Sequence, residues 1–349
     1  MKKEEIYAVL ISSVPNIIYL TNFSYFSTDE RDGFLLVTKK NQYLITSALY
    51  SHAARKFSAR FEVLEAGAGK SFSDILKEII LKEKIKILGI ENDNLKVTEY
   101  DRISKNVKQT KHFDLSSLRI LKDTDEINLI GKACEIGDKA YSQVLKKIRI
   151  GMTEKEIALE LEWIIRQTGA ELSFKPIVAF GPNAAVPHHQ TGNDKLQKNQ
   201  CVLIDFGVKY DNYCSDMTRT FFFGKATYSQ KKVYDTVLES QQKAIEYIEN
   251  QLENNKKPIS TNVDAIARKF VTDAGYPPFN HSSHGIGLEV HELPHISSSN
   301  DPLENGMVFS IEPGIYLPDQ MGVRIEDLFA IQDDKLIPLT HSPKELIEI

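Results

Sequence analysis

Short runs of strand-forming residues alternate with helical patterns in the first third of the chain. Residues 34–37 and 43–46 are apolar and flank a polar turn, and residues 85–90 form a third strand-like run. Before that third run, residues 73–82 carry apolar side chains at helical spacing. This order predicts a small α/β unit from about residue 17 to about residue 114.

A break in the apolar periodicity separates this unit from the rest of the chain. The break ends at Asp123 or Thr124, where a long amphipathic helix starts and keeps its apolar residues on one face as far as Ile148. We therefore expect an N-terminal α/β domain over 1–118 and a second domain over 119–349.

The second domain runs through the same order of elements twice: a long helix, a shorter helix and an apolar hairpin. In the first copy the shorter helix opens with a capping box at Thr153, and the hairpin covers 202–223. In the second copy the helices are expected at 229–252 and 262–274, and the hairpin at 308–331. Two helix pairs and two hairpins predict a pseudo-symmetric α+β domain with a crevice where its halves meet.

Composition narrows the class of protein. With 349 residues, 42% hydrophobic and 26% charged, the chain is too apolar for disorder and long enough for two cores. A net charge of −5, spread evenly, offers no basic stripe to nucleic acid. Three cysteines without a close pair indicate a reducing cytoplasm. The apolar run 8–20 is broken by polar residues, so we expect neither a signal peptide nor a membrane span.

The first hairpin carries acids where strand residues are expected. Asp205 interrupts the apolar run 202–208, and Asp216 follows across the turn. If the turn is centred between positions 210 and 211, the two carboxylates face each other about 5 Å apart. Like charges at that distance are tolerable if a cation lies between them or if one of them is protonated.

The second hairpin repeats this arrangement with glutamates. Glu312 and Glu326 are symmetric about Asp319, which lies in a natural loop, and Pro313 bends the first strand. A single acid of this kind usually lies at a strand end or on the surface. Two matched pairs, one from each half, favour a site in the crevice.

Histidines supply the remaining candidates. His281, His284 and His291 lie within eleven residues of a glycine-containing segment. Residues seven apart on a regular strand point to opposite faces, so His284 and His291 share a site only if the glycines bend or bulge the segment. His188 is a further candidate, and the sequence pattern alone does not separate it from His189.

Four carboxylates and one imidazole suit manganese, cobalt, iron or zinc in a two-metal centre better than a structural zinc bound by thiolates. Cys201 and Cys214 flank the acids and are expected to be packing residues. Two such cations would hold a bridging hydroxide and polarise a carbonyl, which is the chemistry of amide hydrolysis.

The ordered set of candidate ligands carries a resemblance to a known family. It consists of Asp205, Asp216, His284, Glu312 and Glu326, in contexts that include Leu-Ile-Asp-Phe-Gly, Ser-Asp-Met-Thr-Arg-Thr and Ile-Glu-Pro-Gly-Ile-Tyr. This set resembles the pita-bread metallopeptidases, in particular their Xaa-Pro aminopeptidase and prolidase branch. The resemblance covers essentially the whole chain and implies a pita-bread (creatinase/aminopeptidase) catalytic domain preceded by a creatinase-type α/β domain.

The resemblance also implies roles for these residues. The five ligands would hold two divalent ions, most often manganese, with Asp216 and Glu326 bridging. His291 matches the histidine that contacts the substrate carbonyl, His188 matches a further active-site histidine, and Glu312 matches the ligand that shuttles the proton to the departing nitrogen. Relatives are commonly homodimers in which the N-terminal domain contacts the partner or restricts the entrance.

Some positions depart from the family pattern. Many relatives have a histidine where this chain has Asn280, next to His281. Prolidases often have an arginine at the position of His295, and a histidine pairs less well with a dipeptide's carboxylate. Arg324 either contacts the substrate or forms a structural salt bridge.

These departures favour an Xaa-Pro aminopeptidase acting on longer peptides, with a prolidase that cleaves Xaa-Pro dipeptides as the alternative. The fold also carries creatinase-type hydrolases and non-catalytic binding proteins, both of which lose metal ligands. Retention of all five makes a metallopeptidase the expected function.

Overall fold

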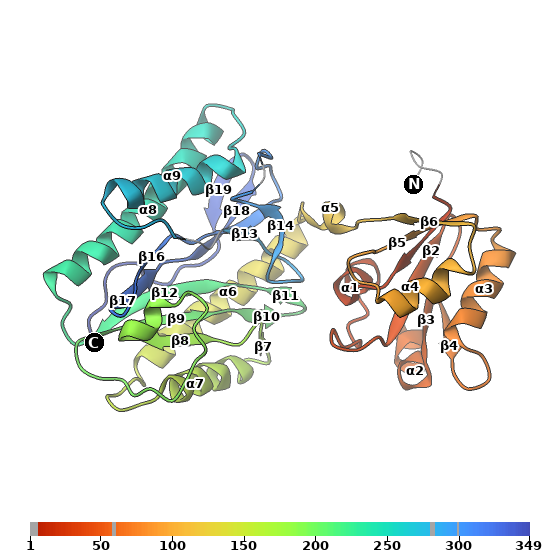
Figure 1. The fold of residues 1–349 in the computed structure, drawn as a ribbon, viewed down its shortest axis with the longest axis horizontal. Helices are drawn as coiled ribbons and strands as arrows, with labels where there is room; N and C mark the ends of the chain where they lie inside the picture. The colour runs from red at the N-terminus through yellow and green to blue at the C-terminus, as the bar shows by residue number, and fades with distance from the viewer. Residues whose placement is uncertain (1–5, 58–60, 280–282, 299) are drawn as a thin grey trace. The chain divides into compact units, whose positions relative to one another are not determined.

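The computed structural model describes residues 6–57, 61–279, 283–298 and 300–349. The chain divides into two compact units, Met1–Leu115 and Ser116–Ile349 (Figure 1). Among the helices of the described residues, none combines the length and apolar character that crossing a membrane requires.

Unit 1 is built on one six-stranded mixed sheet with the strand order β4-β3-β2-β1-β5-β6. The two apolar runs expected as strands pair with each other in antiparallel fashion as β2 and β3, and the third run contains β5. The elements of unit 1 are β1 (Ala8–Ile11), α1 (Val14–Thr21), β2 (Gly33–Thr38), β3 (Gln42–Ser47), α2 (Ala48–Phe57), β4 (Glu62–Ala66), α3 (Phe72–Lys82), β5 (Ile87–Ile90), α4 (Val97–Ser104) and β6 (Gln109–His112).

A buried carboxylate, Glu91, follows β5 and links it by hydrogen bonds to the start of α1. It is 6% exposed and accepts hydrogen bonds from the backbone N–H of Ser12 at 2.5 Å and of Ser13 at 2.8 Å. The Ser12 hydroxyl and the Asn16 amide also donate to it. An anion at this position satisfies backbone donors that the first turn of a helix leaves unpaired.

Unit 2 contains the two expected copies of helix pair and hairpin. The long helix begins at its Asp123 cap, and the capping box at Thr153 is present, so both predicted starts are confirmed. The helices are α5 (Ser116–Arg119), α6 (Thr124–Leu145), α7 (Glu154–Arg166), the 3-10 helix η1 (Gly181–Ala185), α8 (Tyr228–Glu253) and α9 (Ser260–Asp273).

The strands of unit 2 form several small sheets. A three-stranded sheet has the order β12-β9-β8, and a five-stranded sheet has the order β14-β13-β15-β18-β19. The strands are β7 (Glu171–Leu172), β8 (Ile177–Phe180), β9 (Gln200–Phe206), β10 (Val208–Tyr210), β11 (Tyr213–Cys214), β12 (Met217–Phe223), β13 (His284–Gly285), β14 (Glu292–His295), β15 (Val308–Ile311), β16 (Gly314–Leu317), β17 (Met321–Arg324), β18 (Asp327–Gln332) and β19 (Lys335–Pro338).

The predicted register of the first hairpin is wrong by two residues. Asp205 pairs with Thr218, whereas Asp216 lies just before β12 and outside the ladder. The turn is centred one position later than expected because Asp211 and Asn212 adopt positive φ angles of 46° and 73°. Asp and Asn tolerate this left-handed conformation better than other side chains. A shift of two residues keeps both carboxylates on the same face.

The predicted register of the second hairpin is confirmed. Gly314 pairs with Arg324 on one side of the two glutamates, and Ile311 pairs with Asp327 on the other. Glu312 and Glu326 therefore occupy opposite positions in the gap where β15 gives way to β16.

The two hairpins meet through their central strands. The backbone N–H of Glu326 donates to the carbonyl of Thr218 at 3.1 Å, and the backbone N–H of Arg324 donates to the Thr220 hydroxyl at 3.2 Å. Apolar side chains of both hairpins belong to one core cluster, among them Leu203 and Val323. The seam brings the acids of the two hairpins to one place.

Candidate metal centre

Buried acids from both hairpins surround one histidine. Asp216, His284 and Glu326 each offer a ligand atom, and these atoms lie within 4.8 Å of one another. The Nε2 atom of His284 is 3.7 Å from Oδ2 of Asp216 and 3.5 Å from Oε1 of Glu312. The structure thus brings four of the five predicted ligands into mutual proximity.

The fifth predicted ligand, Asp205, is oriented by a buried arginine. The Arg324 guanidinium is 3% exposed and donates to Oδ2 of Asp205, to the Tyr316 hydroxyl at 2.7 Å and to the Thr218 hydroxyl at 2.9 Å. Of the two roles expected for Arg324, these contacts favour the structural salt bridge over contact with a substrate. An arginine in this position partly compensates the charge of the acid cluster.

Three carboxylate oxygens in the cluster lack a protein partner. Oδ1 of Asp205, Oδ1 of Asp216 and Oε1 of Glu326 are buried and have no hydrogen-bond partner among the described residues. A buried acceptor without a partner costs about 1 to 3 kcal/mol, and native structures rarely keep several together. Oxygen-rich sets of this kind fit divalent cations, with the imidazole as an additional ligand.

The electrostatics of the cluster also favour the binding of positive charge. Burial raises the pKa of Asp216 and of Glu312 well above the ordinary range, and the neighbouring carboxylates raise them further. Burial, followed by the charge of Asp205, raises the pKa of Glu326 to about 8. Bound cations would reverse this effect and stabilise the ionised acids.

The Nε2 atom of His284, which faces the acids, carries no proton. Its Nδ1 atom lies 3.1 Å from the carbonyl oxygen of Gly285, which can only accept, so Nδ1 carries the proton. Burial, followed by the nearby His291, lowers the pKa of His284 to about 4. A neutral ring held through Nδ1 leaves Nε2 available as a metal ligand.

The bulge required by the sequence argument is present. The register of β13 shifts between His284 and Gly285, and the rings of His284 and His291 lie 4.3 Å apart at an angle of 76°. Partial desolvation, followed by His188, lowers the pKa of His291, so its ring is neutral at pH 7. His291 lies on the exposed side of the cluster, as does His295, which pairs with His284 across β14.

The structure separates His188 from His189. The Nε2 atom of His189 lies 2.8 Å from a carboxylate oxygen of the buried Glu154, which is not one of the candidate ligands. His188 is exposed, and it contributes to lowering the pKa of His291. Of the two adjacent histidines, His188 therefore fits the candidate role.

The segment that carries His291 is anchored by charges that sequence reasoning missed. Glu292 is nearly buried and accepts hydrogen bonds from Arg119 and, at 3.3 Å, from Lys122. A Cβ atom on Gly287 would lie 2.7 Å from the same carboxylate, so the glycine permits this close approach. The cations lie about 170 positions earlier in the chain, and no local pattern links them to Glu292.

The structure describes the two predicted cysteines of this region but not the candidate residues at positions 280 and 281. Asn280 and His281 lie outside the described residues, so their expected roles stay predictions. Cys201 and Cys214 are buried beside the acids and belong to apolar clusters, which is the packing role expected for them.

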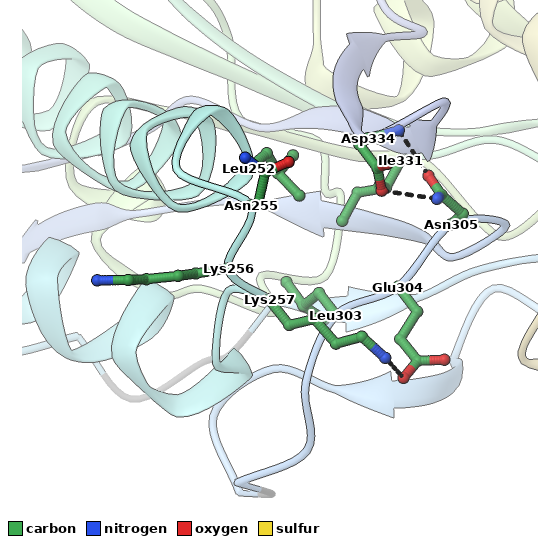
Figure 2. Close-up of a pocket in the computed structure, with 9 residues that line it drawn as sticks. All are labelled: Leu252, Asn255, Lys256, Lys257, Leu303, Glu304, Asn305, Ile331 and Asp334. Carbon is green, nitrogen blue, oxygen red and sulfur yellow. Dashed lines mark hydrogen bonds and ion pairs between the residues drawn. The ribbon is translucent and has the colours of Figure 1, made fainter.

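A surface hollow elsewhere in unit 2 lacks the features of the acid cluster. It has a volume of about 300 Å³ and lies between the end of α8 and β18 (Figure 2). Four of its polar side chains form two pairs: Lys257 with Glu304 at 2.5 Å, and Asn305 with Asp334 at 2.8 Å. The acid cluster is therefore the stronger candidate for chemistry.

Comparisons with known proteins agree with this geometry. The model of metallopeptidase family M24 matches residues 128–333, and that of the Creatinase/Prolidase N-terminal domain matches residues 1–121. The chain is 37% identical to a Xaa-Pro dipeptidase of Pyrococcus horikoshii, covering 99% of this chain and 96% of that protein.

Solved structures are similar over the whole length. A prolidase from Pyrococcus horikoshii has a TM-score of 0.90 at 35% identity, covering 99% of this chain and 97% of that one. An X-Pro aminopeptidase from Thermotoga maritima has a TM-score of 0.87 at 33% identity, covering 99% and 98%. Unit 2 accordingly has the pita-bread fold, and family membership implies divalent metal ions and peptide substrates. The chain belongs to metallopeptidase family M24 and carries the Creatinase/Prolidase N-terminal domain.

Proposed function

We propose that this chain is a Xaa-Pro dipeptidase with two divalent metal ions. The observation that carries the metal site is a set of three buried carboxylate oxygens without a partner among the described residues, two of them on acids that cluster with His284. The residues alone favoured an aminopeptidase on longer peptides. Relatives named Xaa-Pro dipeptidase, 37% and 35% identical over 99% of this chain, favour the dipeptidase alternative instead.

The proposed ligands are the five residues identified above, with manganese as the first metal to test. They are Asp205, Asp216, His284, Glu312 and Glu326. When bound, such ions act as Lewis acids and lower the pKa of a water molecule toward neutrality. Arg324 orients the carboxylate of Asp205. The Thr218 hydroxyl donates to Glu326 at 2.7 Å and so orients an acid of the second hairpin.

The remaining polar groups handle the substrate and the protons. His291 and His188, on the exposed side of the cluster, donate hydrogen bonds to the oxygen of the scissile carbonyl as charge develops on it. Glu312, whose Oε1 accepts from the Ser310 hydroxyl at 2.8 Å, takes the proton of the attacking water and delivers it to the proline nitrogen. Proline at the second position provides an amide without an N–H, which suits a site that does not require that donor.

Preference for a dipeptide over a longer peptide depends on which residue binds the free carboxylate of the dipeptide. We assign this role to His295, which is exposed and can donate a ring N–H to a carboxylate. An imidazole cannot form the two parallel hydrogen bonds that a guanidinium forms with a carboxylate. An Xaa-Pro aminopeptidase therefore stays the second candidate.

Product analysis by mass spectrometry tests the proposal. The manganese-loaded protein is offered an Xaa-Pro dipeptide and an Xaa-Pro-Yaa tripeptide in parallel, with and without a chelator. We expect chelator-sensitive cleavage of the dipeptide and little of the tripeptide. Preferred release of the first residue from the tripeptide would replace the dipeptidase by the aminopeptidase. Cleavage of neither peptide would favour a creatinase-type or binding function.

We also propose that the N-terminal domain, 1–118, contacts a second copy of the chain in a homodimer and restricts access to the site. Support comes from exposed aromatic rings on unit 1: Tyr25 is 55% exposed and Phe57 is 46% exposed, with centroids 5.7 Å apart. Sedimentation analysis of a Tyr25→Ser/Phe57→Ser variant should show a dimer weaker than wild type. An unchanged mass would remove these rings from the interface.

A further inference from the structure

One buried carboxylate supports the loop that carries His188. Glu154 is the first residue of α7 and is 0% exposed. Both of its oxygens accept hydrogen bonds from the end of β8, from η1 and from the loop that follows η1. These donors are the backbone N–H of Phe180 at 3.0 Å, the Asn183 amide at 2.9 Å, His189 Nε2 at 2.8 Å and the backbone N–H of Gly192 at 2.8 Å.

This arrangement makes Glu154 a rigid anchor. Four hydrogen bonds to a carboxylate use its acceptor capacity, and bonds to an ionised acceptor are stronger than neutral ones. The carboxylate also lies at the N-terminus of a helix, where a negative charge is favourable. Because the donors come from both sides of His188 in the sequence, a single side chain fixes the loop before and after that residue.

The opposite side of the loop is tied to the metal centre. The Arg324 guanidinium, which orients Asp205, also donates to the carbonyl of Pro187 at 3.3 Å. Strand β17 packs directly on η1, since a Cβ on Gly322 would lie 1.8 Å from the carbonyl oxygen of Ala184. The backbone of His188 is thus held between Arg324 on one side, through Pro187, and Glu154 on the other, through His189.

We infer that Glu154 is a positioning residue for His188, acting through His189 and the loop rather than by touching substrate. This inference rests on the proposed function, because it assigns Glu154 to the same site. It goes beyond the ligand set, because Glu154 contacts no candidate ligand and lies 51 positions before Asp205. The exposed ring of His188 depends on this support for its orientation, since its own side chain lies at the surface.

A double-mutant cycle tests the inference. Glu154→Gln keeps the size of the side chain but places an amide N–H₂ against donors of the loop. A misplacement of about 1 Å in an active-site group can cost about a hundredfold, so we expect kcat for the dipeptide to fall by that order. In the His188→Gln background, the same change should alter kcat less than about threefold, since its effect passes through His188.

The matched control is Glu156→Gln, which removes the same charge from an exposed acid two residues away on the same helix. It should leave kcat unchanged. Bound manganese per chain, measured by mass spectrometry of the metal, should match wild type in all variants. An equal loss from Glu154→Gln in both backgrounds would show a general structural role and overturn the inference.

A second pair of variants covers the case in which Glu154→Gln does not fold. His189→Ala removes one donor and should lower kcat, whereas His189→Gln retains a side-chain N–H and should restore most of it. If His189→Gln is as inactive as His189→Ala, the ring itself is required and the inference fails.

Hydrogen exchange supplies a readout that does not depend on turnover. Glu154→Gln should speed exchange in peptides covering 180–192, and Glu156→Gln should not. Unchanged exchange would contradict the anchoring role. Failure of the proposed function is recognised separately, because the wild-type protein would then cleave neither peptide while the exchange result still decides whether Glu154 holds the loop.

Discussion

Buried carboxylates occur in both units, but their surroundings differ. In unit 1, Glu91 accepts hydrogen bonds from the Ser12 and Ser13 backbone and from nearby side chains at the start of α1. In unit 2, Asp216 and Glu326 are equally buried, yet each keeps an oxygen without a partner among the described residues. Burial of an acid is therefore common to both, and incomplete hydrogen bonding distinguishes the second.

The difference separates a structural acid from a functional one. Protein donors reach both oxygens of Glu91, so neither oxygen is left without a partner. The cluster in unit 2 combines partnerless oxygens, several acids of the same charge and a neutral imidazole, which is a combination that a cation stabilises and water alone does not. Substitutions of the acids in each site, and removal of metal, test this distinction.

The largest effect is expected from Asp216→Asn. Removing this ligand should lower kcat/KM for the dipeptide by at least about a thousandfold, or ~4 kcal/mol, because an amide is a poorer metal ligand than a carboxylate. Bound manganese should fall in parallel. Asp211→Asn, an exposed acid in the turn of the same hairpin, is the matched control and should change neither quantity. Full activity in Asp216→Asn would refute the ligand assignment.

The pH dependence of stability should reverse when metal is removed. In the metal-free protein, the pKa of Glu326 rises from 4.5 to about 8 through burial and the charge of Asp205. The folded state then binds the proton more tightly than the unfolded state. This stabilisation is complete below pH 4.5 and is lost as the pH rises to about 8, a change of a few kcal/mol.

Metal-loaded protein should behave in the opposite way over the same interval, because cations compete with protons for the ligands. Thermal unfolding between pH 5 and 8, with chelator and with manganese, measures both trends. Parallel curves would indicate that the acids do not bind the added ion.

The sequence predicted much of the framework of this site, and particular residues show where prediction stops. Helical periodicity located α6 and α7, and the symmetry of Glu312 and Glu326 about Asp319 predicted the second register correctly. Such features depend on neighbours in the chain. The first register failed because the turn was centred one position too early, and a run of turn-forming residues allows several centres.

Contacts between distant segments could not be predicted from one sequence. Glu154 directly follows the predicted capping residue Thr153, and nothing local indicates that His189, 35 positions later, donates to it. The pairing of Arg119 with Glu292 spans 173 positions. The fold brings these partners together, and it also decides which of two adjacent histidines pairs with Glu154.

The smallest effect is expected from Glu91→Gln, which tests the structural side of the comparison. The amide N–H₂ would face donors of α1, so the free energy of unfolding should fall by about 1 to 3 kcal/mol. Urea denaturation measures this change, and Glu62→Gln, an exposed acid on β4, is the control. Dipeptide turnover and bound manganese should stay at wild-type values, because Glu91 has its full set of protein donors. A loss of metal in Glu91→Gln without loss of stability would mean that a completed hydrogen-bond shell does not distinguish structural acids from functional ones in this chain.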